Sequence, residues 1–161
     1  VKEKDGSIGL IAKDKAIGNP AAKFIIEESE FAGFDDDLTY YIRSAADSKV
    51  LGNGDSGENN ARIVSEEVDA ANRGQYWSIK TIDLFTFAVE NAFYGQNFDD
   101  GGGNASIDYL LQWPAVAGIW NNAKFRFEPV EGRVGTYIIV SAGKNKMYTL
   151  KDGRMMLTEK K

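Results

Sequence analysis

The chain has 161 residues, a formal net charge of −5, and neither cysteine nor histidine. This length is enough for one domain that buries a core without disulfides or a structural metal. The negative charge argues against a nucleic-acid partner, and the missing residues exclude disulfides, thiol nucleophiles, His-dependent triads and ordinary zinc sites. We therefore expect no cofactor, no metal site and no enzyme activity.

No segment of the sequence predicts a passage through a membrane. The longest apolar stretches, such as Tyr137 to Val140, are far shorter than the roughly 20 residues that cross a bilayer. The sequence does not open on a basic and then apolar leader. We therefore expect no membrane insertion.

Short apolar runs, rich in β-branched and aromatic residues, alternate along the chain with clusters of Gly, Asn and Asp. The 17 glycines and 3 prolines are typical of a chain with many tight turns. The window most like a helix, Ser65–Asn72, is too short to be stable alone. The chain is therefore predicted to be all-β with about 12 short strands, and the runs that favour strands are, in chain order, Ala22–Glu28, Thr39–Ser44, Ala61–Ser65, Tyr76–Ile82, Leu84–Val89, Ile107–Leu111, Lys124–Phe127, Thr136–Val140, Lys146–Leu150 and Met155–Leu157.

Three of these strands begin in the same way, with a small or polar residue, one spacer and a large aromatic residue. The three segments are Ala22-Lys23-Phe24, Gln75-Tyr76-Trp77 and Ala123-Lys124-Phe125, at a spacing of roughly 50 residues. The repeat predicts a single domain over residues 1–161, made of three units at about 40–83, 84–132, and 133–161 together with 1–33. Since the third unit lacks its own aromatic strand, we expect Ala22–Glu28 to pair with the last 30 or so residues.

The segment around Gln75-Tyr76-Trp77 carries a resemblance to a known family. With Tyr40-Tyr41-Ile42 before it and Lys49-Val50-Leu51 as a second strand, this Gln-x-Trp step resembles the ricin B-type β-trefoil lectins. The resemblance implies a β-trefoil, which is a six-stranded barrel capped by three hairpins, with Phe24, Trp77 and Phe125 in one core. It also implies a secreted, periplasmic or cell-surface location.

Lectins of this family usually hold a sugar with an Asp early in the second strand of a unit, an aromatic ring and a neighbouring Asn or Gln. Carried onto this sequence, the Asp position falls near Gly52, Gly95 and Thr149. None of these residues has a carboxylate, so we expect these three positions to take no part in binding.

Two tryptophans outside the repeat positions offer another candidate surface. Trp113 and Trp120 are flanked by the amides Gln112 and Asn121, and aromatic rings beside neutral amides suit a sugar ring with its rim of hydroxyls. The alternative is that both tryptophans plug the open end of the barrel. The loop Asn53–Asn59 spaces oxygen atoms in the manner of a calcium loop, but a solvated turn is the simpler interpretation.

The sequence predicts a non-catalytic, lectin-like carbohydrate-binding module, with Trp113, Trp120, Gln112 and Asn121 as ligand contacts. The alternative is a β-trefoil interaction domain that has lost the sugar site and binds protein. The expected partner is accordingly a glycan or a protein surface, and the expected oligomeric state is a monomer.

Overall fold

The computed structural model describes residues 18–32, 37–114 and 120–158, and within these ranges the chain forms one 12-stranded sheet. None of the helices in the described ranges has the length and apolarity that a bilayer crossing requires. The elements in chain order are η1 (Pro20–Ala22), β1 (Phe24–Ala32), β2 (Leu38–Ser44), β3 (Val50–Gly52), β4 (Val64–Glu66), η3 (Arg73–Gln75), β5 (Trp77–Thr81), β6 (Phe87–Asn91), β7 (Gln96–Asp99), β8 (Leu111–Pro114), η4 (Asn121–Ala123), β9 (Phe125–Pro129), β10 (Thr136–Ser141), β11 (Lys146–Lys151) and β12 (Arg154–Thr158).

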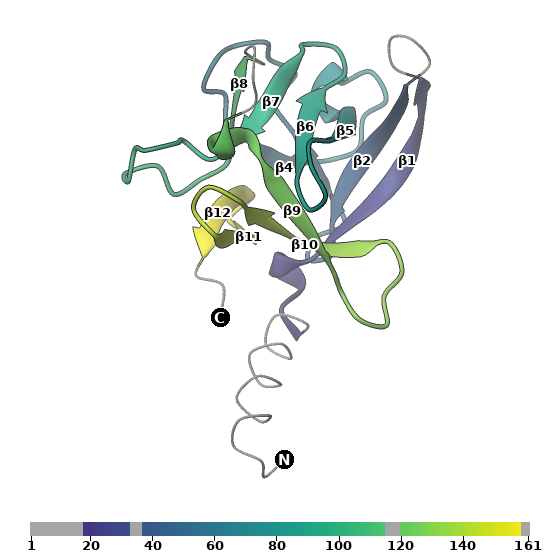
Figure 1. Ribbon diagram of the computed structural model, residues 1–161. Helices are drawn as coiled ribbons and strands as arrows, with labels where there is room; N and C mark the ends of the chain where they lie inside the picture. The colour runs from purple at the N-terminus through teal and green to yellow at the C-terminus, as the bar shows by residue number, and fades with distance from the viewer. Residues whose placement is uncertain (1–17, 33–36, 115–119, 159–161) are drawn as a thin grey trace.

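Six of the strands close a barrel. β1 pairs with β2, β2 with β5, β5 with β6, β6 with β9, and β9 with β10, which returns to β1. The other six form the antiparallel pairs β3–β4, β7–β8 and β11–β12. These pairs touch one another through the bridges Val64 to Arg154, Arg62 to Leu111 and Tyr109 to Met156. This architecture is the predicted all-β trefoil (Figure 1).

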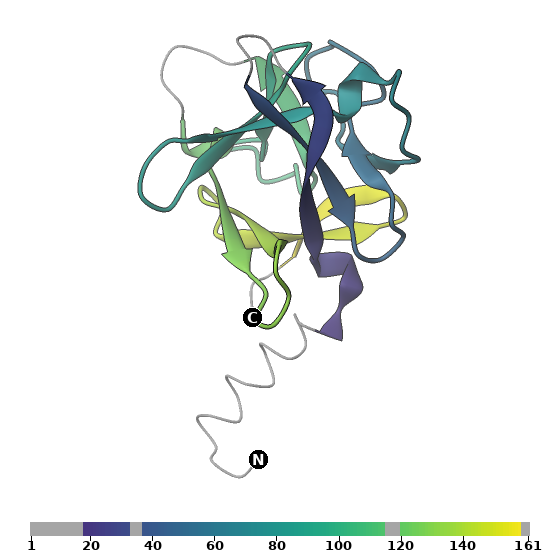
Figure 2. The ribbon, with the colours of Figure 1, turned by 90° about the vertical axis from the view of Figure 1, so that its right-hand side faces the viewer.

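The barrel is closed by its first strand. Phe24 lies opposite Tyr137 and Ile25 opposite Thr136, so β1 fills the gap between β2 and β10. Figure 2 shows the β1–β2 pair facing the viewer, with the yellow strands β11 and β12 passing behind its lower part. The prediction that Ala22–Glu28 pairs with the last 30 or so residues, so that N-terminal and C-terminal segments close the fold, is confirmed.

We number the units by their strands: β1–β4 is the first, β5–β8 the second and β9–β12 the third. The sequence predicts units at 40–83, 84–132 and 133–161 plus 1–33. These units follow the same order of strands, but each begins one strand later, at β2, β6 and β10. Those bounds, and the assignment of the whole chain to one domain, stay predictions.

The core consists of one set of four residues from each unit. Each unit contributes one side chain from its first strand, one from its second, one from its third and one at or just before its fourth. All 12 are buried in a single cluster: Phe24, Ile42, Leu51 and Ile63; Trp77, Val89, Phe98 and Leu110; Phe125, Ile139, Tyr148 and Met155. The three repeat aromatics thus lie in one core.

Several strands differ from the sequence prediction. The runs Ala61–Ser65 and Ile107–Leu111 predict strands, but β4 begins only at Val64 and β8 only at Leu111. The run Leu84–Val89 was expected to be a strand, but β6 begins only at Phe87, and Leu84 and Phe85 are exposed in the turn before it. Asp83 stabilises that turn because its carboxylate accepts hydrogen bonds from the backbone N–H groups of Phe85 and Thr86. β7 was missed because its sequence, Gln-Asn-Phe-Asp, has a single apolar residue.

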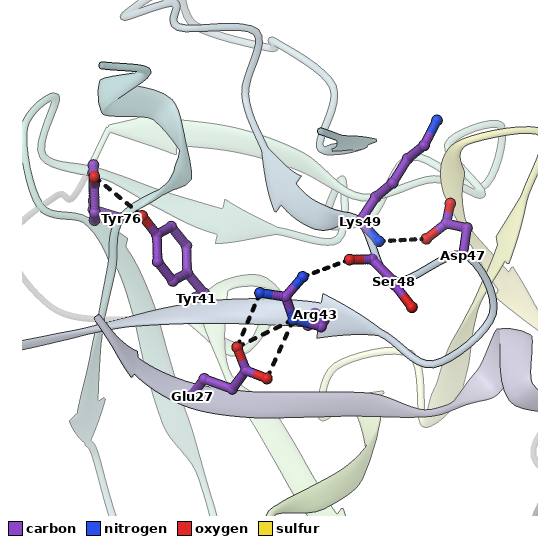
Figure 3. Close-up of polar contacts among 7 residues, drawn as sticks. All are labelled: Glu27, Tyr41, Arg43, Asp47, Ser48, Lys49 and Tyr76. Carbon is purple, nitrogen blue, oxygen red and sulfur yellow. Dashed lines mark hydrogen bonds and ion pairs between the residues drawn. The ribbon is translucent and has the colours of Figure 1, made fainter. Parts of the chain in front are cut away.

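Polar contacts on the outside of the barrel fix the β1–β2 pair (Figure 3). The guanidinium of Arg43 donates from Nε to both carboxylate oxygens of Glu27, at 3.2 and 3.1 Å, and from Nη1 to the carbonyl of Ser48 at 2.6 Å. Tyr41 donates its hydroxyl to that of Tyr76 at 3.1 Å, and burial raises the pKa of Tyr41 to about 12. These bonds tie β2 to β1 on one side and to the start of β5 on the other.

We expect Trp77→Ala to lower the free energy of unfolding by about 3–5 kcal/mol, because it empties a fully buried site in the core. The indole Nε1 also donates to the carbonyl of Leu51 at 2.9 Å, which links the first and second units. Trp77→Phe keeps most of the ring volume and should cost less. Urea denaturation of both variants checks this order, and a Trp77→Ala protein as stable as the parent would contradict the repeat-based core.

Candidate functional site

Strand pairing defines which positions of the three units correspond. In the third and fourth strands, Gly52 lies opposite Val64, Asp99 opposite Leu111 and Thr149 opposite Met156. Each of these three residues directly follows the core residue of its third strand. By the same register, the residues that correspond on the fourth strands are Glu66, Trp113 and Thr158, which lie opposite Val50, Asn97 and Met147.

This register corrects the sequence prediction for the second unit. Gly95 was taken to correspond to Gly52, but it lies in the turn before β7, with a φ of 69°. The residue in the corresponding place is Asp99 at the end of β7. The second unit therefore has the carboxylate that was expected to be missing from all three.

Asp99 is oriented by two hydrogen bonds. Its Oδ1 accepts from the backbone N–H of Gly101 at 2.8 Å, and its Oδ2 accepts from Nδ2 of Asn122 at 2.7 Å. Gly101 has a φ of 84°, and a Cβ atom there would overlap the side chain of Ile107. A glycine is therefore needed for this turn, which holds the carboxylate in place.

Asp99 and Asn122 line a cleft of about 220 Å³ together with Trp113. The cleft is completed by Asn60, Gly101, Gly102, Ile107 and Leu111. Trp113 is 40% exposed, whereas Asp99 is only 5% exposed. The cleft thus places an accessible indole beside a carboxylate whose orientation is fixed.

Burial dominates the electrostatics of this site. It raises the pKa of Asp99 above its usual 3.8, and the charge of Asp100 raises it further, while the hydrogen bonds from Gly101 and Asn122 act in the opposite direction. Burial also raises the pKa of Asp100, against the hydrogen bonds from Ser141 and Gly102.

In the first unit, the corresponding site is filled by the protein's own side chain. Gly52 has no carboxylate, and a Cβ atom there would overlap Oε2 of Glu66. Glu66 accepts from the backbone N–H of Gly54 at 2.7 Å, from Asn72 at 3.0 Å and from Gln75 at 3.1 Å. The carboxylate therefore arrives from the fourth strand, where the second unit has Trp113, and its oxygens are already hydrogen bonded.

In the third unit, the corresponding positions hold two hydroxyl groups. The Oγ1 atoms of Thr149 and Thr158 lie 2.8 Å apart and hydrogen bond to each other. This unit has neither a carboxylate nor an aromatic ring at these positions. Of the three related sites, the second unit alone combines both groups.

The structure separates the four predicted ligand contacts. Trp113 lines the cleft, and Asn121 lines a neighbouring one, but Trp120, which is 67% exposed, lines neither. Residues 115–119, between the two tryptophans, lie outside the described residues.

The structure places Gln112 in the interior, where its side chain is fully buried. Its Oε1 accepts from Asn53 at 2.8 Å, and its Nε2 donates to the carbonyls of Ser56 and Glu58 at 2.9 and 2.8 Å. Gln112 therefore clamps the loop of the first unit, and its role as a ligand contact stays a prediction.

The loop between β3 and β4 is a turn held by its own side chains. Asn53 accepts from the backbone N–H of Ser56, and Asp55 accepts from the backbone N–H of Arg73 and the hydroxyl of Tyr94. Across the described residues, no three His, Cys, Asp or Glu side chains are grouped to hold a metal ion. The oxygen spacing in this loop is explained by these hydrogen bonds.

No protein-family model matches the chain, and no curated protein matches it either. Solved structures do. A designed three-fold symmetric protein, ThreeFoil, superposes with a TM-score of 0.64 at 15% identity, over 75% of this chain and 89% of that chain. An exo-β-1,3-galactanase from Clostridium thermocellum, 1,3Gal43A, superposes with a TM-score of 0.58 at 19% identity, over 87% of this chain and 27% of that one.

A chain of the PSL1a-E64 complex superposes with a TM-score of 0.55 at 26% identity, over 75% of this chain and 41% of that one. This chain thus spans less than half of the PSL1a and galactanase chains. The similarities show a β-trefoil of the ricin B type, which is the fold that the Gln-x-Trp resemblance implied.

We expect Gly52→Asp to lower the stability of the domain by about 1–3 kcal/mol, the range for a buried group that disrupts a hydrogen-bonded site. The new side chain would displace Glu66 and bring two carboxylates together. Gly52→Asp combined with Glu66→Ala removes that conflict and should recover part of the loss. Thermal or urea unfolding measures both, and an unchanged Gly52→Asp protein would contradict the filled site.

We expect wild type to gain stability relative to Asp99→Asn as the pH falls from 7 towards 4. Because the pKa of Asp99 is raised in the folded state, its ionised form carries a penalty above that pKa, and protonation removes the penalty. The altered hydrogen bonds of the variant add an offset that does not depend on pH. Denaturation of both proteins at several pH values gives the slope of their difference in unfolding free energy against pH.

Asp83 supplies the matched control. Hydrogen bonds from the backbone N–H groups of Phe85 and Thr86 lower the pKa of this exposed carboxyl. Wild type should therefore lose stability relative to Asp83→Asn as the pH falls below 3.8, the usual value. Equal slopes for the two variants would show that burial does not control Asp99.

Proposed function

We propose that this chain is a non-catalytic carbohydrate-binding module that binds one neutral sugar ring in the cleft of the second unit. The observation that carries the proposal is the combination of an oriented carboxylate at Asp99 with the exposed indole of Trp113 in one cleft. The related positions of the first and third units hold Glu66 and the Thr149–Thr158 pair instead. We therefore propose one binding site per chain.

The chemistry of a hexose matches these groups. One face of the ring presents C–H bonds, which pack on an aromatic surface, and its rim carries hydroxyls that donate and accept hydrogen bonds. The carboxylate of Asp99 retains lone pairs beyond the two bonds it accepts, and the amide oxygen of Asn122 adds an acceptor. A cleft of about 220 Å³ is smaller than the roughly 300–1,000 Å³ of pockets for drug-sized ligands, so it suits a single ring.

The comparisons support a lectin-like module in coarser terms. The galactanase aligns with this chain over 27% of its own length, so the likeness concerns only part of that enzyme. From the resemblance of Gln75-Tyr76-Trp77 to the ricin B-type lectins we propose a secreted, periplasmic or cell-surface location. We propose a monomeric state independently of that resemblance.

Protein binding is the second candidate function, and exposed apolar side chains favour it. Leu84 and Phe85 are 89% and 74% exposed in the turn between β5 and β6. Such side chains are common at sites of protein contact. They lie outside the residues that line the cleft, so the two functions can be tested separately.

We expect a monosaccharide to bind with a dissociation constant on the order of millimolar, or about −4 kcal/mol. Galactose, glucose, mannose and N-acetylglucosamine would be titrated by calorimetry and tryptophan fluorescence. Trp113→Ala should abolish binding, and Asp99→Asn should weaken it at least about tenfold, the loss expected for a charged hydrogen bond. The measured stoichiometry should be one sugar per chain.

Trp120→Ala is the matched control, because Trp120 is exposed but does not line the cleft. Its affinity should stay close to that of the parent. Loss of binding in this variant would restore the prediction that both tryptophans contact the sugar. The protein-binding function would replace this proposal if the parent protein bound none of the four sugars but bound a protein partner through Leu84 and Phe85.

A further inference from the structure

A second cleft adjoins the first. It has a volume of about 310 Å³ and is lined by Asp100, Gly102, Gly103, Asn121, Asn122, Gly143 and Lys144. Gly102 and Asn122 line both clefts. The second cleft thus extends from the Trp113 cleft towards the turn between β10 and β11. The second and third units meet there.

Glycine keeps this second cleft open. A Cβ atom at Gly143 would lie 3.0 Å from Oδ2 of Asp100 and 3.0 Å from the carbonyl oxygen of Asn121. Any side chain at position 143 would therefore crowd these two acceptors. Because Gly143 has none, no side chain at position 143 occupies the space beside these two oxygen atoms.

The second cleft offers hydrogen-bond groups of both kinds. Asp100 is 1% exposed and accepts from the hydroxyl of Ser141 and from the backbone N–H of Gly102. Lys144 is fixed by donating from Nζ to the carbonyls of Ile107 at 2.7 Å and Asn104 at 3.4 Å. An ammonium group has three donors, so one remains for a ligand.

The balance of charge favours a neutral ligand over an acidic one. Among the residues that line the two clefts, Lys144 is cationic, whereas Asp99 and Asp100 are acidic. An anionic sugar would gain one attraction and meet two carboxylates. A ring with hydroxyls only can donate to Asp100 and accept from Lys144.

We propose that the second cleft binds the next residue of a neutral oligosaccharide whose first residue occupies the Trp113 cleft. The site thus selects glycans of two or more residues over single sugars. The second residue is held by hydrogen bonds that the carboxylate of Asp100 and the carbonyl of Asn121 accept and that Lys144 donates, since no aromatic ring lines the described part of this cleft. This inference rests on the proposed carbohydrate-binding function.

The test compares the four monosaccharides with their β-linked disaccharides galactobiose, cellobiose, mannobiose and chitobiose. For the sugar that binds, we expect the disaccharide to bind at least about fivefold more tightly than the monosaccharide. Digalacturonate should gain nothing over galacturonate. Equal affinity of monosaccharide and disaccharide overturns this inference and leaves the proposed function standing, whereas no binding by any of the sugars overturns both.

Two variants locate the effect. Gly143→Val fills the second cleft. Lys144→Met removes the charge of the side chain but keeps most of its aliphatic part. The Lys144→Met variant remains usable if Gly143→Val fails to fold. In each, the disaccharide advantage should fall below about twofold while the monosaccharide affinity stays within about twofold of the parent. Lys80→Met, on β5 and outside both clefts, is the matched control and should keep the full advantage. An advantage that persists in Lys144→Met and Gly143→Val contradicts the second cleft as its source.

Discussion

The packing of equivalent side chains from the three units in one core is the constraint on which the rest of the structure depends. Phe24, Trp77 and Phe125 lie with nine other buried side chains in one cluster, and the volumes of these side chains must fit together. Because the core residues stand at the same places in each unit, the strands that carry them have a common register. The loops between those strands are not bound by this constraint, so they can differ while the barrel stays the same.

The three related surface sites show how that freedom has been used. The same backbone N–H, that of Gly54 in the first unit and Gly101 in the second, receives a carboxylate in both. In one unit this carboxylate comes from Glu66 on the fourth strand, and in the other from Asp99 on the third. This backbone N–H needs an acceptor in both units and finds it on different strands. Because Asp99 supplies the acceptor in the second unit, the position that Glu66 holds in the first unit is free for the indole of Trp113.

The sequence could predict the fold because aromatic side chains at the starts of strands recur along the chain. It could not place the site, because β7 has one apolar residue and the glycine of the preceding turn, Gly95, looked like the counterpart of Gly52. The partner residues across the strands, not the local sequence, show that Asp99 holds that place. The burial of Gln112 could not be predicted for a similar reason, because it depends on Asn53 and the loop that follows it, more than 50 residues earlier in the chain.

The Gln112 clamp makes the units unequal partners. The strand that carries Trp113 is fastened to Ser56 and Glu58 of the first unit, so the unit whose own site is filled by Glu66 supports the strand that lines the open one. Three copies of the second unit joined in a ring would repeat Asp99 and Trp113 three times, but the loop Asn53–Asn59 that receives Gln112 would be missing. A fully symmetric version of this domain would therefore lose a support that the present, unequal units provide.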